Sequence, residues 1–553
     1  MHTSSANPTF FQTRSIRIVY WLIGLAALVM GLFLVFRPGY VPGDVGDARF
    51  NMYILEHGYR WLLRLDTSFW NAPIFYPASN TVALSDNHLG TFLIYSLFRS
   101  LGASRELAFL LWGIVLSILN FTITWLALRK FNVHPIAAIA GAYLFSFGYV
   151  VIGQIGHIQL MPRFMVPIAF WMATRFIETG DVRHFAFFLA ACAFQFYLGF
   201  YMGYFLGLIL APYCLALIVI RRSWRPFIDN LRSCDRRRLI FRAIGYATCC
   251  IGFVIVLIPL AIPYLKALES VGGRPWSAIV PQLPRLGSYL FAPLSNVWTG
   301  MNQGQFGEFA VEHQLFLGLI PLLSLLTLPF VVQKDEAHRK LYEIGIPMAF
   351  AIFAVFIITL YYKGHSLYYF VWYCFPGARG IRAVTRAIIV LLFPISFVLA
   401  GSLTFFLEKI VKRFNHMIAI TAGCILLGLL AVDQSTKDRS FSFEYNQKRI
   451  ADLREKIQQV ATGVPNGKIL WAHSAAAEPF YVTQIDAMLA SQEMGLSSIN
   501  GYSGNAPKNY PASLMFLDEN ACAAMSEWVH GHSEKITKDN LIEVGADCPV
   551  FEH

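Results

Sequence analysis

The sequence predicts an all-α polytopic membrane protein that ends in a small α/β domain. Of the 553 residues, 56% are hydrophobic and only 14% are charged, whereas about a quarter of the residues are charged in soluble proteins. Uncharged apolar runs of about twenty residues recur, and each is long enough to cross a hydrocarbon core of roughly 30 Å. After Asp433 the composition turns polar, which predicts a second domain.

Eleven apolar runs are predicted to be transmembrane helices. They lie near residues 17–36, 106–128, 135–152, 162–177, 184–201, 203–220, 243–262, 314–332, 344–362, 387–407 and 416–432. The stretch 184–220 contains no Lys, Arg, Asp or Glu, and as one helix it would be about 55 Å long. Because that is too long for one crossing, we divide it at residues 199–203.

Basic residues indicate the orientation of the chain. The first span follows Arg14 and Arg17 and lacks a small-residue cleavage site, so we interpret it as a retained anchor. Eight arginines between residues 221 and 242 form a predicted loop that faces anionic lipid on the cytoplasmic side. The net charge of +11 is explained by such loops, and no recognition module accompanies them, which argues against nucleic-acid binding.

With eleven spans and a cytoplasmic N-terminus, the C-terminal tail lies outside the cytoplasm. Residues 1–432 are therefore the predicted membrane domain, with a long first outer loop at 37–105, and residues 433–553 are the predicted outer α/β domain. Two further outer segments are expected at 263–313 and 363–386. Within the tail, we expect a helix at 445–461 and strands at 468–472 and 541–544, and Cys522 can pair with Cys548 in an oxidising compartment.

Two acids follow the first span directly. Asp44 and Asp47 belong to the run Gly-Asp-Val-Gly-Asp-Ala-Arg, and on a helical turn they would share a face. A carboxylate at this boundary can act as general base toward an acceptor hydroxyl, or hold a divalent metal against a phosphate. The alternative is a solvated acidic cap next to Arg49.

The far end of the same loop carries Asp86 and His88, a second acid and a possible metal ligand. Together with Asp47 they are the residues that could hold a divalent metal, although the predicted chemistry does not require one. The alternative for His88 is an interfacial histidine that is bonded to backbone.

Polar residues also collect between later spans on the outer side. Gln154, His157 and Gln159 could bind sugar hydroxyls or satisfy backbone groups at a helix break, and Glu312 lies above another span. Three arginines, Arg379, Arg382 and Arg386, precede a span on the side where the positive-inside trend disfavours them. Guanidinium groups suit bidentate phosphate contacts, so substrate binding is favoured over simple anchoring.

These motifs resemble the GT-C superfamily of membrane glycosyltransferases, in which a first span leads into a long outer loop with an acidic motif. The resemblance implies transfer of a sugar from a polyprenyl-phosphate carrier at the outer face, with Asp44 or Asp47 as general base and Asp86 as the second acidic position. The chain departs from the mannosyltransferase pattern, because Val45 follows Asp44 where an adjacent Asp-Glu pair is typical, and it lacks the Trp-Trp-Asp signature of oligosaccharyltransferases.

The chain also resembles a group of bacterial multispan proteins, a resemblance that brings no activity with it. The shared sequence motifs lie at residues 43–49, 69–73, 85–87 and 500–507. This resemblance implies a bacterial inner membrane, with the C-terminal domain in the periplasm. Residues 500–507 are dense in turn formers and could cover the active site, contact glycan, or serve as a structural loop.

The sequence thus predicts a glycosyltransferase. Its donor would be a sugar linked to polyprenyl phosphate, and its acceptor a glycan, lipid or protein. Two alternatives stay open: a lipid or glycan transporter, and a non-catalytic subunit of glycan assembly. An ion-coupled transporter usually needs charge within the membrane, and no acidic or basic residue lies deep in a predicted span.

Overall fold

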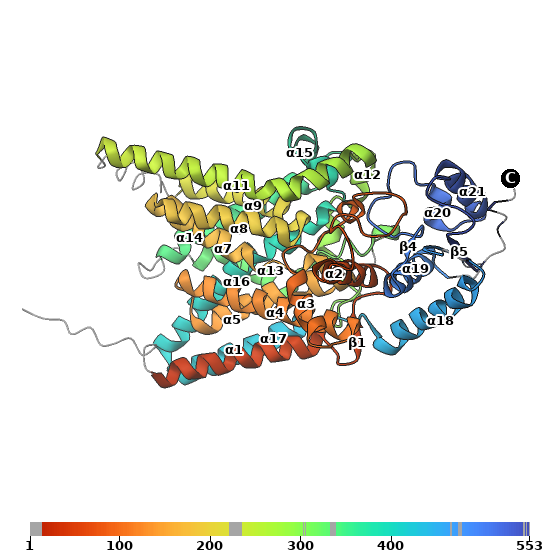
Figure 1. Cartoon of the computed structure of the whole chain (residues 1–553). Helices are drawn as coiled ribbons and strands as arrows, with labels where there is room; N and C mark the ends of the chain where they lie inside the picture. The colour runs from red at the N-terminus through yellow and green to blue at the C-terminus, as the bar shows by residue number, and fades with distance from the viewer. Residues whose placement is uncertain are drawn as a thin grey trace, which may run out of the picture.

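The structure is a computed structural model of the whole chain (Figure 1). It describes residues 14–220, 235–301, 304, 306–331, 339–464, 467–473, 478–545, 548 and 550–551. Long apolar helices lie side by side at one end of the molecule, and the elements that follow residue 440 lie at the other end, with α2 between them.

Every predicted span contains a helix. These helices are α1 (Arg14–Val35), α4 (Arg105–Lys130), α5 (Pro135–Phe147) with α6 (Tyr149–Ile152), α7 (Met165–Thr179), α8 (Val182–Leu198), α9 (Phe200–Ile220), α11 (Arg236–Val271), α13 (Leu319–Val331), α14 (Arg339–Thr359), α16 (Ala387–Arg413) and α17 (His416–Asp433). Within the described residues, eight helices are long and apolar enough to cross a membrane. Helices α7, α8 and α13 are shorter, so the number of eleven crossings stays a prediction.

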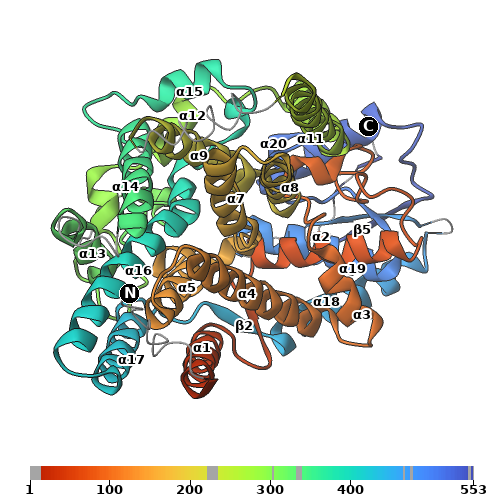
Figure 2. The same cartoon turned by 90° about the vertical axis from the view of Figure 1, so that its left-hand side faces the viewer.

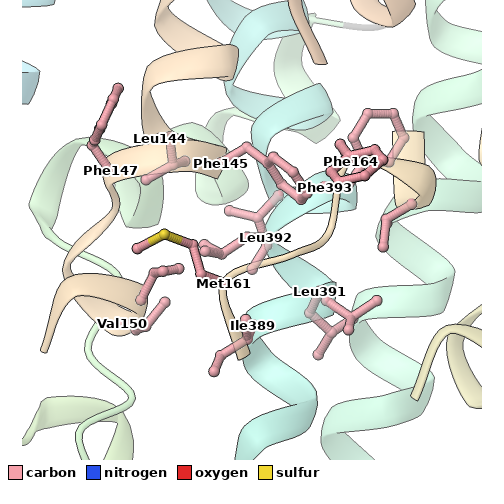
Figure 3. Packing of buried hydrophobic residues seen from close by; sticks show 14 of the residues in the cluster. Leu144, Phe145, Phe147, Val150, Met161, Phe164, Ile389, Leu391, Leu392 and Phe393 are labelled. Atoms are coloured by element: carbon pink, nitrogen blue, oxygen red, sulfur yellow. The ribbon is translucent and has the colours of Figure 1, made fainter. Parts of the chain in front are cut away.

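Helices α5 and α16 form the centre of the bundle (Figure 2). Every residue of α5 is buried, as is the first half of α16, which is the burial expected of helices that are apolar on all sides. Figure 3 shows the apolar packing where Phe145 approaches Phe393, with Leu392 below them and Ile389 further down, toward Met161 and Val150.

A buried arginine secures the break that follows α5. The helix is interrupted at Gly148, so the carbonyl of Phe145 loses its helical partner, and the Nη2 of Arg163 donates to that oxygen at 2.8 Å. The Nη1 of Arg163 donates to the carbonyl of Ile389 at 2.9 Å. Arg163 is completely buried, and these hydrogen bonds tie α5, the segment before α7 and α16 together, because buried polar groups require partners.

The division of the stretch 184–220 is confirmed. Helix α8 ends at Leu198 and α9 begins at Phe200, with Gly199 in an extended conformation between them. Helix α11 continues through Pro263 to Val271, so the predicted second outer segment at 263–313 begins within a helix, and where it leaves the membrane stays a prediction. It ends where Gly272 adopts a φ of +80°, which glycine tolerates without strain.

The predicted arginine loop is only partly described. The arginines at 221, 222, 225 and 232 lie outside the described residues. The arginines at 236, 237, 238 and 242 are helical and belong to the first turns of α11, where the carboxylate of Asp235 caps the helix by accepting from the N–H of Arg238 at 2.7 Å. These four arginines are thus helical, and their position on the cytoplasmic side of a membrane stays a prediction.

The elements of the segments predicted to be outer, here called the outer elements, are short. They comprise β1 (Tyr40–Pro42), α2 (Asp47–Leu62), η2 (Thr81–Leu84), α3 (Phe92–Ser100), η3 (Ile155–Leu160), α12 (Trp276–Ile279), η4 (Val280–Gln282), η5 (Leu286–Leu290), η6 (Gly307–Phe309), α15 (Tyr368–Cys374), η8 (Ala378–Gly380) and η9 (Val384–Arg386). They surround the region where the predicted site residues lie.

The tail contains the helix and the strands that the sequence predicts. Its elements are β2 (Ser440–Ser442), α18 (Phe443–Ala461), β3 (Ile469–Ala472), α19 (Phe480–Met494), β4 (Ser497–Ser498), α20 (Ala512–Phe516), α21 (Ala521–Gly531) and β5 (Leu541–Val544). Strands β4, β3 and β5 form a parallel sheet in that order. Cys522 and Cys548 form a disulfide, with Cα atoms 5.5 Å apart.

The tail does not pack as an isolated unit. Strand β1 pairs antiparallel with β2, so the first outer loop and the beginning of the tail share a ladder. One hydrophobic cluster also joins the two, because Phe50, Tyr53 and Phe75 from the first loop pack with Met488 and Ile499 from the tail. The boundary at residue 433 therefore stays a prediction, and this shared core is what positions the site.

Candidate functional site

Asp47 is the first residue of α2 and lies near the middle of the outer elements. Its Oδ2 is 2.5 Å from Nδ1 of His157, and its Oδ1 accepts a hydrogen bond from the hydroxyl of Tyr502 at 2.6 Å. The turn before the helix needs Gly43, whose φ is +109° and where an added Cβ would lie 2.7 Å from the Cβ of Ala48. The N-terminus of a helix also favours a carboxylate, because its free N–H groups carry partial positive charge.

A chain of alternating charges extends from this carboxylate. The Nε2 of His157 is 3.3 Å from Oε1 of Glu312. Glu312 in turn holds Arg386 through contacts of 3.0 Å at Nε and 2.5 Å at Nη2. We call Asp47, His157, Glu312 and Arg386 the polar chain. It connects the first outer loop, η3, the segment before α13 and the beginning of α16.

The polar chain shifts the pKa values of its members. Burial raises the pKa of Asp47, but the charge and hydrogen bond of His157, with help from Tyr502 and Arg386, bring it below the ordinary value. Burial and Arg386 lower the pKa of His157, yet Asp47 and Glu312 outweigh them and raise it to about 9. Burial raises the pKa of Glu312, and Arg386 and His157 lower it well below its usual range. At neutral pH, His157 is therefore an imidazolium between two carboxylates.

Asp44 lies beside the polar chain but is not part of it. Its Oδ2 is 3.2 Å from Nη2 of Arg439, and its Oδ1 accepts from the N–H of Gly46 at 3.1 Å. An added Cβ at Gly156 would lie only 2.2 Å from Oδ2 of Asp44, so this acid packs directly against the turn that carries His157. Its side chain is 36% exposed, compared with 22% for Asp47, which makes it the more accessible acid.

The predicted alternative of an acidic cap next to Arg49 is wrong. Arg49 is completely buried, and it forms an ion pair with Asp486 of α19 and a 2.7 Å hydrogen bond with Asn446 of α18. The acids and the arginine of the run 43–49 thus point to different neighbours. Its two acids face the site, whereas its arginine anchors α2 to the tail.

Asp86 is buried next to the polar chain. Its Oδ1 accepts a hydrogen bond of 3.3 Å from the backbone N–H of Phe200, the first residue of α9. Burial raises the pKa of Asp86 to about 6, although the positive charges of Arg386 and His157 oppose the rise. These interactions place Asp86 within electrostatic reach of the polar chain.

His88 does not join Asp47 and Asp86 in a metal site. Its Nε2 is 2.7 Å from Oδ1 of Asn51, whose amide donates to Oε1 of Gln159 at 2.8 Å. Burial lowers the pKa of His88 to about 3, so it is neutral. Within the described residues, no group of three or more His, Cys, Asp or Glu side chains is arranged to hold a metal ion. The residues present do not fit the predicted metal.

The other predicted residues are two glutamines near η3 and two arginines of the late loop. Gln159 is held by Asn51, and Gln154 is buried with its side-chain amide lacking a hydrogen bond to any described residue. Arg379 is exposed, and its guanidinium lies over the ring of Trp372 at 5.0 Å. Arg382 is half-buried, and its backbone N–H donates to the hydroxyl of Tyr201 at 3.1 Å.

Several site residues escaped the sequence analysis. Tyr502 belongs to the turn-rich segment 500–507, for which the sequence left open a place at the active site, but its contact with Asp47 was not predicted. Arg439 and Tyr201 gave no signal, because one follows the last span and the other lies in an apolar run. Tyr201 packs its ring 5.4 Å from the guanidinium of Arg386, so it joins α9 to the polar chain.

An apolar cavity of about 620 Å³ lies between α8 and α11. It adjoins Leu89 and Gly90, which follow Asp86 and His88 in the first loop. The helices contribute Ala186, Leu189, Ala190, Ala193, Phe194, Tyr197, Cys249, Gly252, Phe253 and Val256. The cavity therefore brings apolar surface to the end of the loop that carries Asp86.

Comparison with known proteins adds a likeness of fold alone. No family model matches the chain, and no curated protein matches it. Among solved structures, the oligosaccharyltransferase of Archaeoglobus fulgidus, crystallised in complex with Zn and sulfate, is similar over 87% of this chain with a TM-score of 0.44 and 11% sequence identity. The chain spans 62% of the length of that protein. A likeness at this score leaves the function of the chain to be inferred from its own residues.

Proposed function

We propose that the chain is a membrane glycosyltransferase that moves a sugar from a polyprenyl-phosphate-linked donor to a hydroxyl of a lipid, glycan or protein at the outer face of a bacterial inner membrane. The observation that carries the proposal is the polar chain. It joins an ionised carboxylate of the first loop, Asp47, through His157 and Glu312 to the guanidinium of Arg386 before α16, although Asp47 and Arg386 are more than three hundred residues apart in sequence.

The proposed reaction needs a proton acceptor at one end and positive charge at the other. The acceptor oxygen attacks the anomeric carbon and loses its proton to Asp47, while the bond from that carbon to the phosphate oxygen breaks and the phosphate leaves with the electron pair. Because His157 and Tyr502 lower the pKa of Asp47 despite its burial, the carboxylate is ionised at neutral pH. General-base assistance of this kind typically contributes about 10²- to 10⁴-fold.

The remaining residues have supporting roles in the proposal. His157 and Glu312 hold Asp47 and Arg386 in place through the polar chain. Among the described residues, Asp86 accepts one hydrogen bond, at Oδ1, so its second oxygen can accept from a sugar hydroxyl. Two nitrogens of Arg386 are already bonded to Glu312. In the proposal, Arg379 and Arg382 therefore bind the leaving phosphate.

The test is transfer by the purified full-length protein from a panel of polyprenyl-phosphate-linked sugars. Asp47→Asn is expected to lose about 10²- to 10⁴-fold in rate, and Asp44→Asn serves as the matched change at the neighbouring acid. Full activity in both variants removes the proposed base. Movement of an intact lipid-linked sugar without bond cleavage indicates a transporter. A function that survives neutralisation of Asp44, Asp47 and Asp86 but is lost without the tail indicates a non-catalytic subunit.

The apolar cavity supports a donor carried on a lipid, because it offers apolar surface next to the loop of Asp86. An added Cβ at Gly252, which lines the cavity, would meet no atom within 4 Å, and the same holds for Gly207 in α9, which does not line it. We expect Gly252→Trp to raise KM for a long-chain donor more than for a short-chain donor. Gly207→Trp is the control, and an equal effect of both variants would remove the cavity from the proposal.

A further inference from the structure

The segment that follows α14 exposes large apolar side chains on and around a short helix, α15. Those between residues 362 and 375 are 42% to 66% exposed, and we call them the α15 patch: Tyr362, Leu367, Tyr369, Phe370, Tyr373 and Phe375. The rings of Phe370 and Tyr373 lie 6.2 and 6.4 Å from that of Tyr369, so these side chains are neighbours. Exposed apolar patches typically mark a surface that contacts another molecule or a membrane.

The other side of α15 is packed against the protein, which fixes the direction of the patch. Tyr368, the first residue of the helix, is completely buried. The Nε1 of Trp372 donates to the carbonyl of Arg274 at 3.1 Å, and its ring lies 5.7 Å from that of Trp276. Because one side of the helix is held in this way, the exposed side chains point away from the bundle.

Helix α15 is attached to the end of a helix that is long and apolar enough to cross a membrane, α14. The hydroxyl of Ser366 donates to the carbonyls of Ile358 and Thr359 in the last turn of α14, at 3.3 and 3.4 Å, and it accepts from the N–H of Tyr368 at 3.2 Å. Figure 1 shows α15 at the end of the bundle that faces the tail, and Figure 2 shows it at the rim. The patch therefore lies where α14 ends.

The exposed side of α14 has the pattern of a lipid-facing helix. Its large exposed side chains are Phe350, Phe353 and Ile357, whose spacing of three and four residues places them in one stripe. In a helix that crosses a membrane, an apolar stripe of this kind contacts the acyl chains. The stripe ends at Ile357, one residue before a carbonyl that Ser366 binds, so the α15 patch begins where the stripe ends.

The charges of the same segment suit anionic lipid. Residues 360–386 contain one lysine, three arginines and no Asp or Glu. Lys363 is exposed, and its Nζ lies 5.5 Å from the centre of the Tyr362 ring. Basic residues are attracted to anionic headgroups, and tyrosine and tryptophan are enriched at membrane–water interfaces. A second copy of the chain on this patch would instead bring like charges together.

We propose that the α15 patch lies in the membrane–water interface, with its apolar side chains at the boundary between headgroups and acyl chains and with Lys363 near the lipid phosphates. Interfacial helices bury an apolar face at this depth. The partner of the patch is thus the lipid bilayer, and this surface does not depend on the proposed sugar transfer. Because α15 leads into the late loop, it holds Arg379 and Arg382 close to the headgroups.

The test is photocrosslinking of the full-length protein in nanodiscs of phosphatidylethanolamine and phosphatidylglycerol, with lipid adducts identified by mass spectrometry. The probe is Phe370→p-benzoylphenylalanine. The same change at Phe353 on α14 is the positive control, and at Phe516, which is 54% exposed on α20 of the tail, it is the matched negative control. We expect at least about tenfold more lipid adduct at Phe370 than at Phe516, because apolar surroundings favour a side chain of this size by such a factor.

A yield at Phe370 no greater than at Phe516 overturns the proposal. The same probe in cell membranes distinguishes other occupants, and a crosslink mainly to another polypeptide or to a second copy of the chain also overturns it. If the Phe370 variant does not fold, the same change at Tyr373 decides, because that side chain is 63% exposed. Lys363→Gln should lower the phosphatidylglycerol share of the adducts by about fivefold, and an unchanged share overturns the placement of Lys363.

Discussion

The ion pair between Glu312 and Arg386 permits a quantitative test of the polar chain. The two side chains are only 7% and 9% exposed, and they share contacts of 3.0 and 2.5 Å. The substitution Glu312→Gln keeps the shape of the side chain but leaves the Arg386 guanidinium buried without its carboxylate. Removing one partner of a buried pair typically costs about 3 to 5 kcal/mol, because the remaining charge is left uncompensated.

The measurement is the free energy of unfolding of the purified protein in detergent, followed by tryptophan fluorescence. Glu308→Gln is the matched control, because Glu308 lies four positions earlier and is exposed. Its effect should stay within about 0.5 kcal/mol. A second variant that combines Glu312→Gln with Arg386→Met removes both charges, and it should be less destabilised than Glu312→Gln alone.

Two results would refute this reasoning. A decrease in the free energy of unfolding below about 1 kcal/mol for Glu312→Gln would mean that water or another acid compensates the charge of Arg386. Exposed ion pairs contribute energies of this small size because water solvates their charges. A double variant whose loss equals the sum of the two single losses would mean that Glu312 and Arg386 are not coupled.

Three further predictions concern pH, the tail loop and the disulfide. The pKa of His157 is raised from 6.5 to about 9. The protonated side chain therefore contributes fully to stability below pH 6.5, and this contribution is lost as the pH rises through about 9. In His157→Gln, the free energy of unfolding should decline less over this pH range than in the wild type. Tyr502→Phe removes a hydrogen bond that lowers the pKa of Asp47, so the acid limb of the pH–rate profile should move to higher pH, and an unshifted limb contradicts the role of Tyr502. Replacing Cys522 and Cys548 by serine should cost about 2 to 4 kcal/mol of stability, and equal unfolding curves with and without reductant would show that the disulfide contributes nothing.

Much of the fold follows from local pattern. The apolar runs, the division of 184–220 and the strand at 541–544 each depend on residues that are close in sequence, and each is found where the sequence places it. The continuation of α11 through Pro263 was not predicted, because a proline within an apolar helix is tolerated when neighbouring groups satisfy the freed carbonyl.

The candidate site follows from pattern only in part. Asp44, Asp47, Asp86 and the late arginines attract notice by their chemistry and by their place at span ends. Their partners follow from pattern less well, since the contact of Tyr502 with Asp47 could not be read from its turn-rich loop, and Arg439, which pairs with Asp44, gave no signal after the last span.

By itself, the sequence determined the class of protein, the places of its helices and the residue types available for chemistry, because hydrophobic periodicity and charge act over a few turns of chain. Only the tertiary structure decided which acids and cations meet. It placed His157 between Asp47 and Glu312 and turned Arg49 away toward the tail. Such pairings depend on the packing of segments hundreds of residues apart, and no local pattern records that packing.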